Sequence, residues 1–359
     1  MQVSEQRTKK LMDAKLQNDI KFNCDVSDAQ YWGFFSICGL LLRYRDLYRS
    51  EKGIKPWSEI DRQDIGAWIE NKEVRWPDLE HAGFRDLLID GKSYQAFDAA
   101  GINNAIREHG LVYGAGYGMY MKPTFFLAQL RSFRTISGLS VSISGTEYVR
   151  DLFTSPGMLQ GKNIFLRLEP LMVLLLYKLS ELNTRRVTAL EDAFAHYGFH
   201  HQQIIDQTFE KRIWELTDRY ADILLSHEIA EYHEDVPEWK DLLALAGDRK
   251  AEHYLRAVKD LIADTSDHGP YKRIIDMRDR GALSLTIALM EGYRRVLFPE
   301  LQGAYNEFCK QGDWSAMERS RQAGYERFRS SRDAIVDLYR GSSGKDDFTK
   351  KIRERLQTT

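Results

Sequence analysis

Apolar residues recur at helical spacing through most of the second half of the chain. This spacing covers residues 185–197, 201–235, 237–263, 282–309 and 313–339, and each segment predicts an amphipathic helix. Pro237 suits a first helical position, Asp313 suits a helix cap, and Gly247 is expected to weaken or break the third of these helices. Residues 163–182 are apolar on almost every side, which predicts a buried central helix that Pro170 either kinks or begins.

The first third of the chain opens with two expected helices, over residues 25–48 and 58–75. Three polar residues suit a cap ahead of the first helix: Asp25, Ser27 and Asp28. The apolar run of residues 31–42 is shorter than the roughly 20 residues that cross a bilayer, so we expect it to pack inside the protein.

Strand signals follow these helices. Asp90-Gly91 is a hairpin signal, and the alternation over Leu139, Val141 and Ile143 is typical of a half-buried strand. We therefore predict a small antiparallel sheet between residues 87 and 145, interrupted by a short helix over 98–109. The glycines of "GAGYG", residues 114–118, lack the spacing and the lysine of a phosphate loop, which favours close packing between strands over phosphate binding.

These elements predict a mostly α fold of the α+β class. We expect helices and a small antiparallel sheet over residues 1–150, a multi-helix bundle over 151–342, and a charged C-terminal tail over 343–359.

Composition narrows the functional classes. The chain has 359 residues, of which 43% are hydrophobic, and its net charge is −2. A charge so close to balance gives no global attraction to nucleic acid or to an anionic membrane, so we expect neither as a partner. The start of the chain has no apolar stretch of signal-peptide length, and its three cysteines form no CxxC pair, which predicts a cytoplasmic protein.

The segment "LLSHEIAEYHED", residues 224–235, carries the strongest chemical signal. On a helical wheel, His227, Glu231 and Glu234 lie within roughly 40° of Tyr220, inside the apolar stripe that leads into them. A histidine and a carboxylate one turn apart are how helices present metal ligands, and these donors suit zinc, manganese or iron. Only half of the zincin signature is present, since its second histidine is replaced by Glu231. Glu228, on the flank, would be a general base toward bound water.

Further ligands would come from "IADTSDHGP", which contains Asp264 and His268. Capping or loop roles fit these two residues equally well.

Three arginines occupy inward faces of the last two predicted helices: Arg294, Arg321 and Arg332. A buried charge is costly unless it is paired, so these arginines need carboxylates or an anionic ligand. Such arginines beside a metal ion would bind a small anionic molecule.

Two functional interpretations follow. The first is a metal-binding cytoplasmic protein, a hydrolase or oxidase that acts on an anionic small molecule. The alternative is a non-enzymatic binding or assembly protein whose buried polar core is a structural salt-bridge network without cofactor. Nothing in the sequence predicts the oligomeric state.

Three stretches together, "AQYWGFFSICGLLLR", "GLVYGAGYGMYMKPTFFLAQL" and "SHEIAEYHE", resemble an uncharacterised bacterial protein family of unknown function. The resemblance extends over most of the chain. It implies a cytoplasmic bacterial protein and supplies no activity and no site residue.

Overall fold

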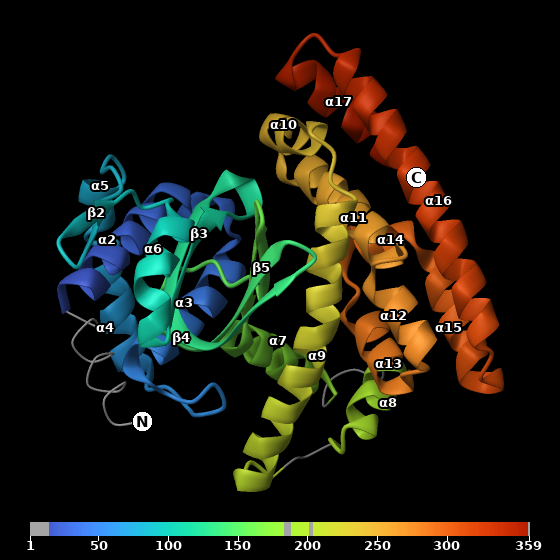
Figure 1. Cartoon of the computed structure of the whole chain (residues 1–359), viewed down its shortest axis with the longest axis horizontal. Coiled ribbons are helices and arrows are strands. Elements are labelled where there is room, and N and C mark those ends of the chain that lie inside the picture. Colours follow the sequence, from blue (N-terminus) through green and yellow to red (C-terminus); the bar gives the residue numbers. More distant parts are fainter. Residues whose placement is uncertain (1–13, 183–187, 201–203, 358–359) are drawn as a thin grey trace. The chain divides into compact units, whose positions relative to one another are not determined.

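The computed structural model describes residues 14–182, 188–200 and 204–357, and it divides the chain into two compact units, Met1–Val173 and Leu174–Thr359 (Figure 1). The predicted helix starts at residues 185 and 201 lie outside the described residues. The predicted division near residue 150 is wrong, because two strands that follow this point complete the sheet of the first unit.

The first unit combines helices with two sheets. Its helices are α2 (Ala14–Tyr31), α3 (Ile37–Lys52), α4 (Arg62–Glu73), α5 (Trp76–Leu79) and α6 (Ala99–Ile106), with 3-10 turns η1 (Trp32–Phe34), η2 (Arg107–His109) and η3 (Met119–Met121). Its strands are β1 (Leu87–Ile89), β2 (Lys92–Tyr94), β3 (Leu111–Tyr117), β4 (Pro123–Ile136), β5 (Leu139–Arg150), β6 (Gly157–Gln160) and β7 (Asn163–Arg167).

Strands β1 and β2 form an antiparallel hairpin, as the Asp90-Gly91 signal predicts, and both turn residues have positive φ. The other strands form a five-stranded sheet in the order β3-β4-β5-β7-β6, in which β5 and β7 are parallel. The small antiparallel sheet of the prediction is therefore confirmed, and a larger mixed sheet accompanies it.

The glycines of β3 serve close packing. A Cβ atom on Gly114 would lie 1.9 Å from the ring of Phe126 on the neighbouring strand, and one on Gly116 would lie 2.2 Å from the Gln160 side chain. Larger side chains on β4 and β6 therefore occupy the space above these two residues, as the packing interpretation predicts.

A buried ion cluster ties α2 to the sheet. Asp25, Ser27 and Asp28 lie inside α2, so the prediction that they cap a helix is wrong. The ammonium group of Lys122 donates to the Ser27 hydroxyl at 2.7 Å and lies 3.2 Å from Asp28 and 3.4 Å from Asp151. Burial alone would lower the pKa of Lys122, but the two carboxylates outweigh burial and raise it. The cluster therefore holds a charged lysine in the core of this unit.

The apolar run of residues 31–42 does not pack inside as predicted. Ile37 is 81% exposed and Trp32 is 47% exposed. The run is split between η1 and the start of α3, with Ser36 as the N-cap of α3, so one helical face does not continue through it. The side of α3 that packs inside lies further along the helix, at Tyr44, Leu47 and Tyr48.

The Glu169 carboxyl group of helix α7 (Leu168–Glu181) is expected to weaken the first unit as the pH rises. Burial raises its pKa from 4.5 to about 7, and the Glu147 carboxylate adds to this. Below 4.5 the group is protonated in both the folded and the unfolded chain. Between these two pH values the carboxyl group ionises only in the unfolded chain, which lowers the free energy of unfolding. Above about pH 7 it is also ionised in the folded chain, where the buried charge is unfavourable. Glu169→Gln is therefore expected to raise the free energy of unfolding by about 1–3 kcal/mol at pH 8 and little at pH 4.5, measured by urea denaturation.

Glu59→Gln, which changes an exposed carboxyl group, serves as the control and is expected to have little effect at either pH. An equal gain for Glu169→Gln at both pH values would contradict the prediction.

The second unit is helical throughout its described residues. After the end of α7 it contains α8 (Thr188–His196), α9 (Gln207–His233), α10 (Glu238–Leu245), α11 (Arg249–Thr265), α12 (Pro270–Met277), α13 (Arg280–Leu289), α14 (Gly292–Leu297), α15 (Pro299–Gln311), α16 (Trp314–Arg340) and α17 (Lys345–Gln357). A mostly α fold with a C-terminal multi-helix region is confirmed.

Several predicted boundaries change within these helices. The break near Gly247 is confirmed, since it separates α10 from α11, and Asp313 caps α16 as predicted. The helix predicted over residues 282–309 is three helices. The predicted charged tail is wrong as well, because α17 is a helix that buries Phe348 and Ile352 in the core of this unit.

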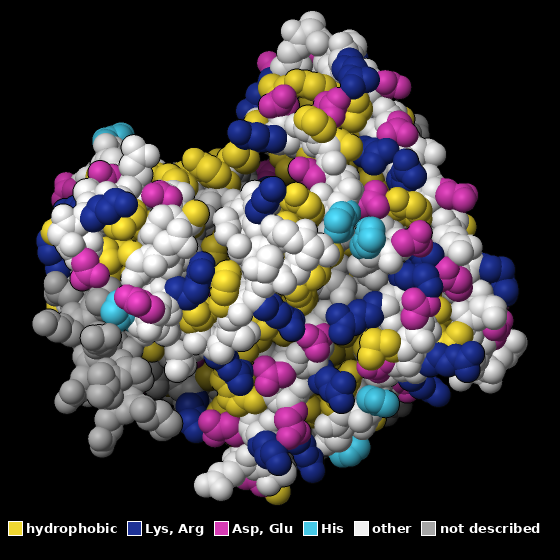
Figure 2. Space-filling view, viewed as in Figure 1, with side chains coloured by type: hydrophobic (Ala, Val, Ile, Leu, Met, Phe, Trp, Pro, Cys, Tyr) yellow, Lys and Arg dark blue, Asp and Glu magenta, His cyan; other side chains and the backbone are white. Residues whose placement is uncertain are grey.

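Figure 2 shows lysine and arginine side chains interspersed with aspartate and glutamate over the face in view, as the near-zero net charge predicts. Within residues 14–182, 188–200 and 204–357, no helix combines the length and the apolar character that crossing a bilayer requires.

Candidate metal site between α9 and α11

Helix α9 presents the candidate residues at the end of its buried side. The Asp206 side chain caps the helix by accepting a hydrogen bond from the backbone N–H of Phe209 at 2.8 Å. Buried residues recur along the helix from there: Phe209, Ile213, Leu216, Ile223 and Leu225. His227 and Glu231 follow on this side with side chains only 14% and 18% exposed. The apolar residues of the helix therefore turn this imidazole and this carboxylate away from bulk water.

His227 is held from behind by Asp264 of α11. Its Nδ1 atom lies 2.7 Å from Asp264 Oδ1, so the carboxylate accepts a hydrogen bond from the Nδ1–H group. This bond leaves Nε2 as the ring nitrogen that faces Glu231, and a metal ion there would replace the proton that Nε2 carries in the charged ring. A carboxylate behind a histidine fixes the ring and its tautomer, and metal-binding histidines are usually oriented in this way.

Glu231 is also held from α11 and turns its second oxygen toward His227. Lys259 donates to Glu231 Oε1, while Glu231 Oε2 lies 3.8 Å from His227 Nε2. Two atoms bound to one tetrahedral zinc ion lie roughly 3.3–3.5 Å apart, so a small movement would let both bind a single ion.

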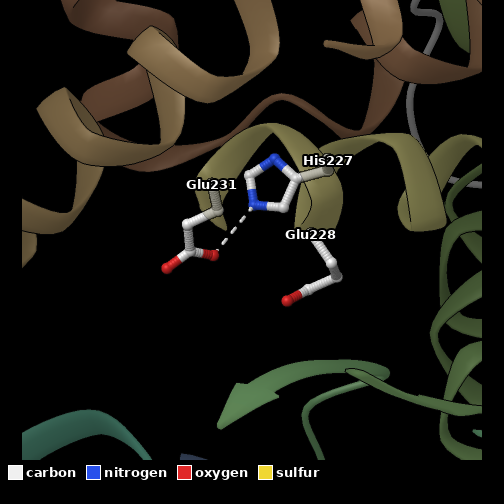
Figure 3. Close-up of side chains that lie close together, drawn as sticks. All are labelled: His227, Glu228 and Glu231. Carbon is white, nitrogen blue, oxygen red and sulfur yellow. Dashed lines mark ion pairs between the residues drawn. The ribbon is translucent and has the colours of Figure 1, made fainter. Parts of the chain in front are cut away.

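Glu228 adds a third donor. Figure 3 shows the side chains of His227, Glu228 and Glu231 extending from one side of α9, and one ligand atom of each lies within 4.8 Å of the others. Glu228 is 4% exposed, and its carboxyl group makes no hydrogen bond or ion pair with any residue that the structure describes. The Glu228 oxygens are therefore not engaged by a neighbouring side chain and can serve as donors to a ligand.

The electrostatics of the site reflect this crowding. Burial raises the pKa of Glu228, and the Glu231 carboxylate raises it further, to about 8. Burial would lower the pKa of His227, but Asp264 more than compensates and raises it to about 10. Burial would likewise raise the pKa of Glu231, yet Lys259 and His227 lower it. The carboxyl groups of the site thus outnumber its lysine and histidine. One carboxyl group is therefore expected to stay protonated when no other cation is bound.

Arg294 extends the network on the far side of Asp264. Its Nη1 atom lies 3.5 Å from Asp264 Oδ2, and its Nε atom lies 4.0 Å from Asp260. Arg294 is therefore the one predicted anion-binding arginine that reaches residues of the site, and it is already paired with carboxylates.

Four other predicted site residues have partners of their own. Glu234 accepts a hydrogen bond from the Tyr325 hydroxyl at 2.8 Å, and His268 stacks on His233 with ring centroids 4.4 Å apart. Neither makes a contact with His227 that would support its predicted role as a ligand.

The remaining two predicted arginines also have carboxylate partners. Arg321 binds both carboxylate oxygens of Glu318 and the carboxylate of Asp267, and it donates to the backbone carbonyl of Thr265. Arg332 pairs with the adjacent Asp333 at 2.8 Å. The carboxylates that the sequence analysis required are therefore present, and these arginines are engaged without an anionic ligand.

Sequence reasoning missed Lys259 and Asp260, and it proposes Asp264 as a ligand, whereas the structure pairs Asp264 with His227 and Arg294. All three lie on the polar side of α11, where they were invisible as partners because a helical pattern does not reveal which helix packs against that side. Asp264 was predicted as a metal ligand, but its Oδ1 atom is engaged by His227 Nδ1 and its Oδ2 atom faces Arg294. The arrangement suits a residue that orients a ligand.

Two family models match the chain, and together they cover most of it. The N-terminal domain of a family of unknown function (DUF6866) matches residues 15–167, and the C-terminal domain of the same family matches residues 173–359. The junction of the two matches agrees with the structural division at Val173. No curated protein and no solved structure matches the chain.

Proposed function

The chain belongs to the DUF6866 family, whose function is unknown, and from the geometry of His227, Glu228 and Glu231 we propose that it binds a divalent metal ion. His227 Nε2 and one carboxylate oxygen from each glutamate are the proposed ligands. Asp264 orients the imidazole from behind.

One observation carries the proposal: the atoms of His227 and Glu231 that face each other are those that α11 leaves unused. Asp264 engages Nδ1 and Lys259 engages Oε1, so Nε2 and Oε2 are turned into the same space, where the unpartnered carboxyl group of Glu228 also lies. One imidazole nitrogen and two carboxylate oxygens thus converge on one space.

The donor set suits zinc, manganese or iron, since one imidazole and two carboxylates are ligands that all three accept. Three protein ligands leave coordination positions for water and for substrate, which fits metal-assisted hydrolysis or oxidation. The second carboxylate oxygen of Glu228 is not needed as a ligand, and we propose it as the group that accepts a proton from bound water.

For the substrate we propose an anionic small molecule. Arg294 is the only one of the three predicted arginines near the site, and its two carboxylate contacts are long. Its guanidinium group has further N–H donors for an anion. The free cysteines fit a reducing cytoplasm, and the family resemblance implies a bacterial source.

The alternative is a non-enzymatic protein in which this network is structural. The pairs Lys259–Glu231 and Arg294–Asp264 favour it, because they supply cations to two of the acidic residues without a metal.

Metal analysis separates the two. The purified protein, stripped with a chelator and then exposed to zinc, manganese or ferrous iron alone, is expected to retain about one equivalent of at least one of them after dialysis. Retention would be measured by elemental analysis and its thermodynamics by calorimetry. A folded protein that retains none of the three metals would exclude the metal site and leave the structural network.

A further inference from the structure

Resting on the proposed metal site, we propose that the side chain of Lys259 is its built-in competitor: in the metal-free protein its ammonium group is the cation on Glu231 Oε1, and a divalent ion that binds the neighbouring Oε2 repels it from the carboxylate. Binding would then be an exchange of one cation for another.

The contact between Lys259 and Glu231 is specific to the site. Lys259 reaches across from α11 to Glu231 Oε1, and both side chains are only 18% exposed. The other cation of α11 near this end, Arg256, has a different partner, since its Nε atom binds Glu252 at 2.8 Å. Lys259 is thus a cation of α11 that forms an ion pair with a proposed metal ligand.

The two helices are paired in opposite directions at this point. His227 of α9 meets Asp264 of α11, and Glu231, one turn later on α9, meets Lys259, more than one turn earlier on α11. Glu231, nearer the end of α9, therefore faces Lys259. His227, one turn before it, faces Asp264. α11 supplies a carboxylate that favours a metal on His227 and an ammonium group that opposes one on Glu231.

Charge makes the two cations mutually exclusive at close range. A divalent ion bound to Glu231 and Glu228 would lie within a few ångströms of the ammonium group that now contacts Glu231, and like charges repel strongly where water is scarce. A second positive charge lets a divalent ion bind both glutamates, whereas a monovalent ion would gain little by replacing an ammonium group of the same charge. The exchange therefore selects divalent cations, and it keeps the helix pair intact when no metal is bound.

Lys259→Met tests the exchange, because it keeps most of the side-chain volume and removes the charge. Its zinc affinity, measured by calorimetry with zinc alone, is expected to exceed that of the unaltered protein by roughly tenfold or more. Its metal-free form is expected to melt at a lower temperature, and zinc is expected to raise its Tm by more than it raises that of the unaltered protein.

Lys250→Met is the matched control, because it removes one positive charge from the same helix at an exposed position about 13 Å along the axis. Its zinc affinity is expected to change little. This control separates the contact with Glu231 from the general effect of net charge.

The outcomes distinguish the exchange from the metal site itself. If the unaltered protein binds zinc and Lys259→Met binds it no more tightly, the exchange is wrong and the metal site stands. If Lys259→Met binds zinc and the unaltered protein retains none of the three metals, the substitution has created the site, and the exchange is overturned. If neither protein binds zinc, manganese or iron, the metal site fails and the exchange fails with it.

Discussion

Replacing His227 by alanine is expected to weaken metal binding by roughly 100-fold or more, because the proposed site would lose its only nitrogen ligand together with the orientation that Asp264 provides. Asp264→Asn is expected to weaken binding by about 10–100-fold, since the amide no longer supplies the negative charge that makes the imidazole a better ligand. Both affinities would be measured by calorimetry with the metal that the unaltered protein retains.

His233→Ala is the matched control for His227→Ala. His233 belongs to the same helix, is exposed, and stacks on His268 instead of facing the site. Its removal is expected to leave the metal affinity unchanged. Full metal binding by a folded His227→Ala protein would contradict the ligand assignment, and equal losses in both histidine variants would point to nonspecific binding by surface histidines.

Lys122→Met is expected to lower the free energy of unfolding of the first unit by about 3–5 kcal/mol, the usual range when one partner of a buried ion pair is removed. The substitution would leave the carboxylates of Asp28 and Asp151 in the core without the ammonium group that now lies 3.2 Å and 3.4 Å from them. Burial already raises the pKa of Asp28 to about 6 with the lysine present, so its charge depends on this neighbour. Urea denaturation would measure the loss.

Two further variants test whether the loss of stability comes from the buried ion cluster. Lys162→Met removes an exposed lysine near the sheet and is expected to change stability by less than about 0.5 kcal/mol. Asp28→Asn added to Lys122→Met is expected to recover part of the loss, because one uncompensated charge disappears. A Lys122→Met protein as stable as the unaltered one would show that the cluster is not an energetic anchor of the fold.

The direction of side chains along a single helix was accessible from the sequence. The period of 3.6 residues relates Leu216 and Ile223 to His227 and Glu231 without any knowledge of the rest of the fold. This is why the inward orientation of the last two side chains could be predicted, and the structure has them largely buried.

The partners of these side chains could not be predicted from the sequence, because they come from distant positions in the chain. Asp264 lies 37 residues from His227 and Lys259 lies 28 residues from Glu231, on a helix whose polar side gives no sign of its neighbour. A long-range ion pair depends on how two helices are packed, and no local pattern encodes that packing.

Errors in the predicted elements have a related origin. Ile164, Phe165 and Leu166 are consecutive apolar residues because they lie in β7, which is buried in the sheet, and periodicity alone does not separate such a strand from a buried helix. The prediction for the C-terminal segment was wrong for the opposite reason: a polar segment proved to be a packed helix. Its charges outnumber its apolar residues, yet the two that it buries, Phe348 and Ile352, suffice to anchor it.

The position of α17 also imposes an order on biosynthesis. The ribosome makes a chain from its N-terminus, and every residue of the first unit has been added by Val173. The core of the second unit, by contrast, draws on Phe348 and Ile352, and the Gly247 backbone N–H binds the Thr349 hydroxyl at 3.0 Å. Until α17 emerges, the side chains of α10 and α11 that it covers face water, so the nascent second unit needs protection from aggregation for longer than the first.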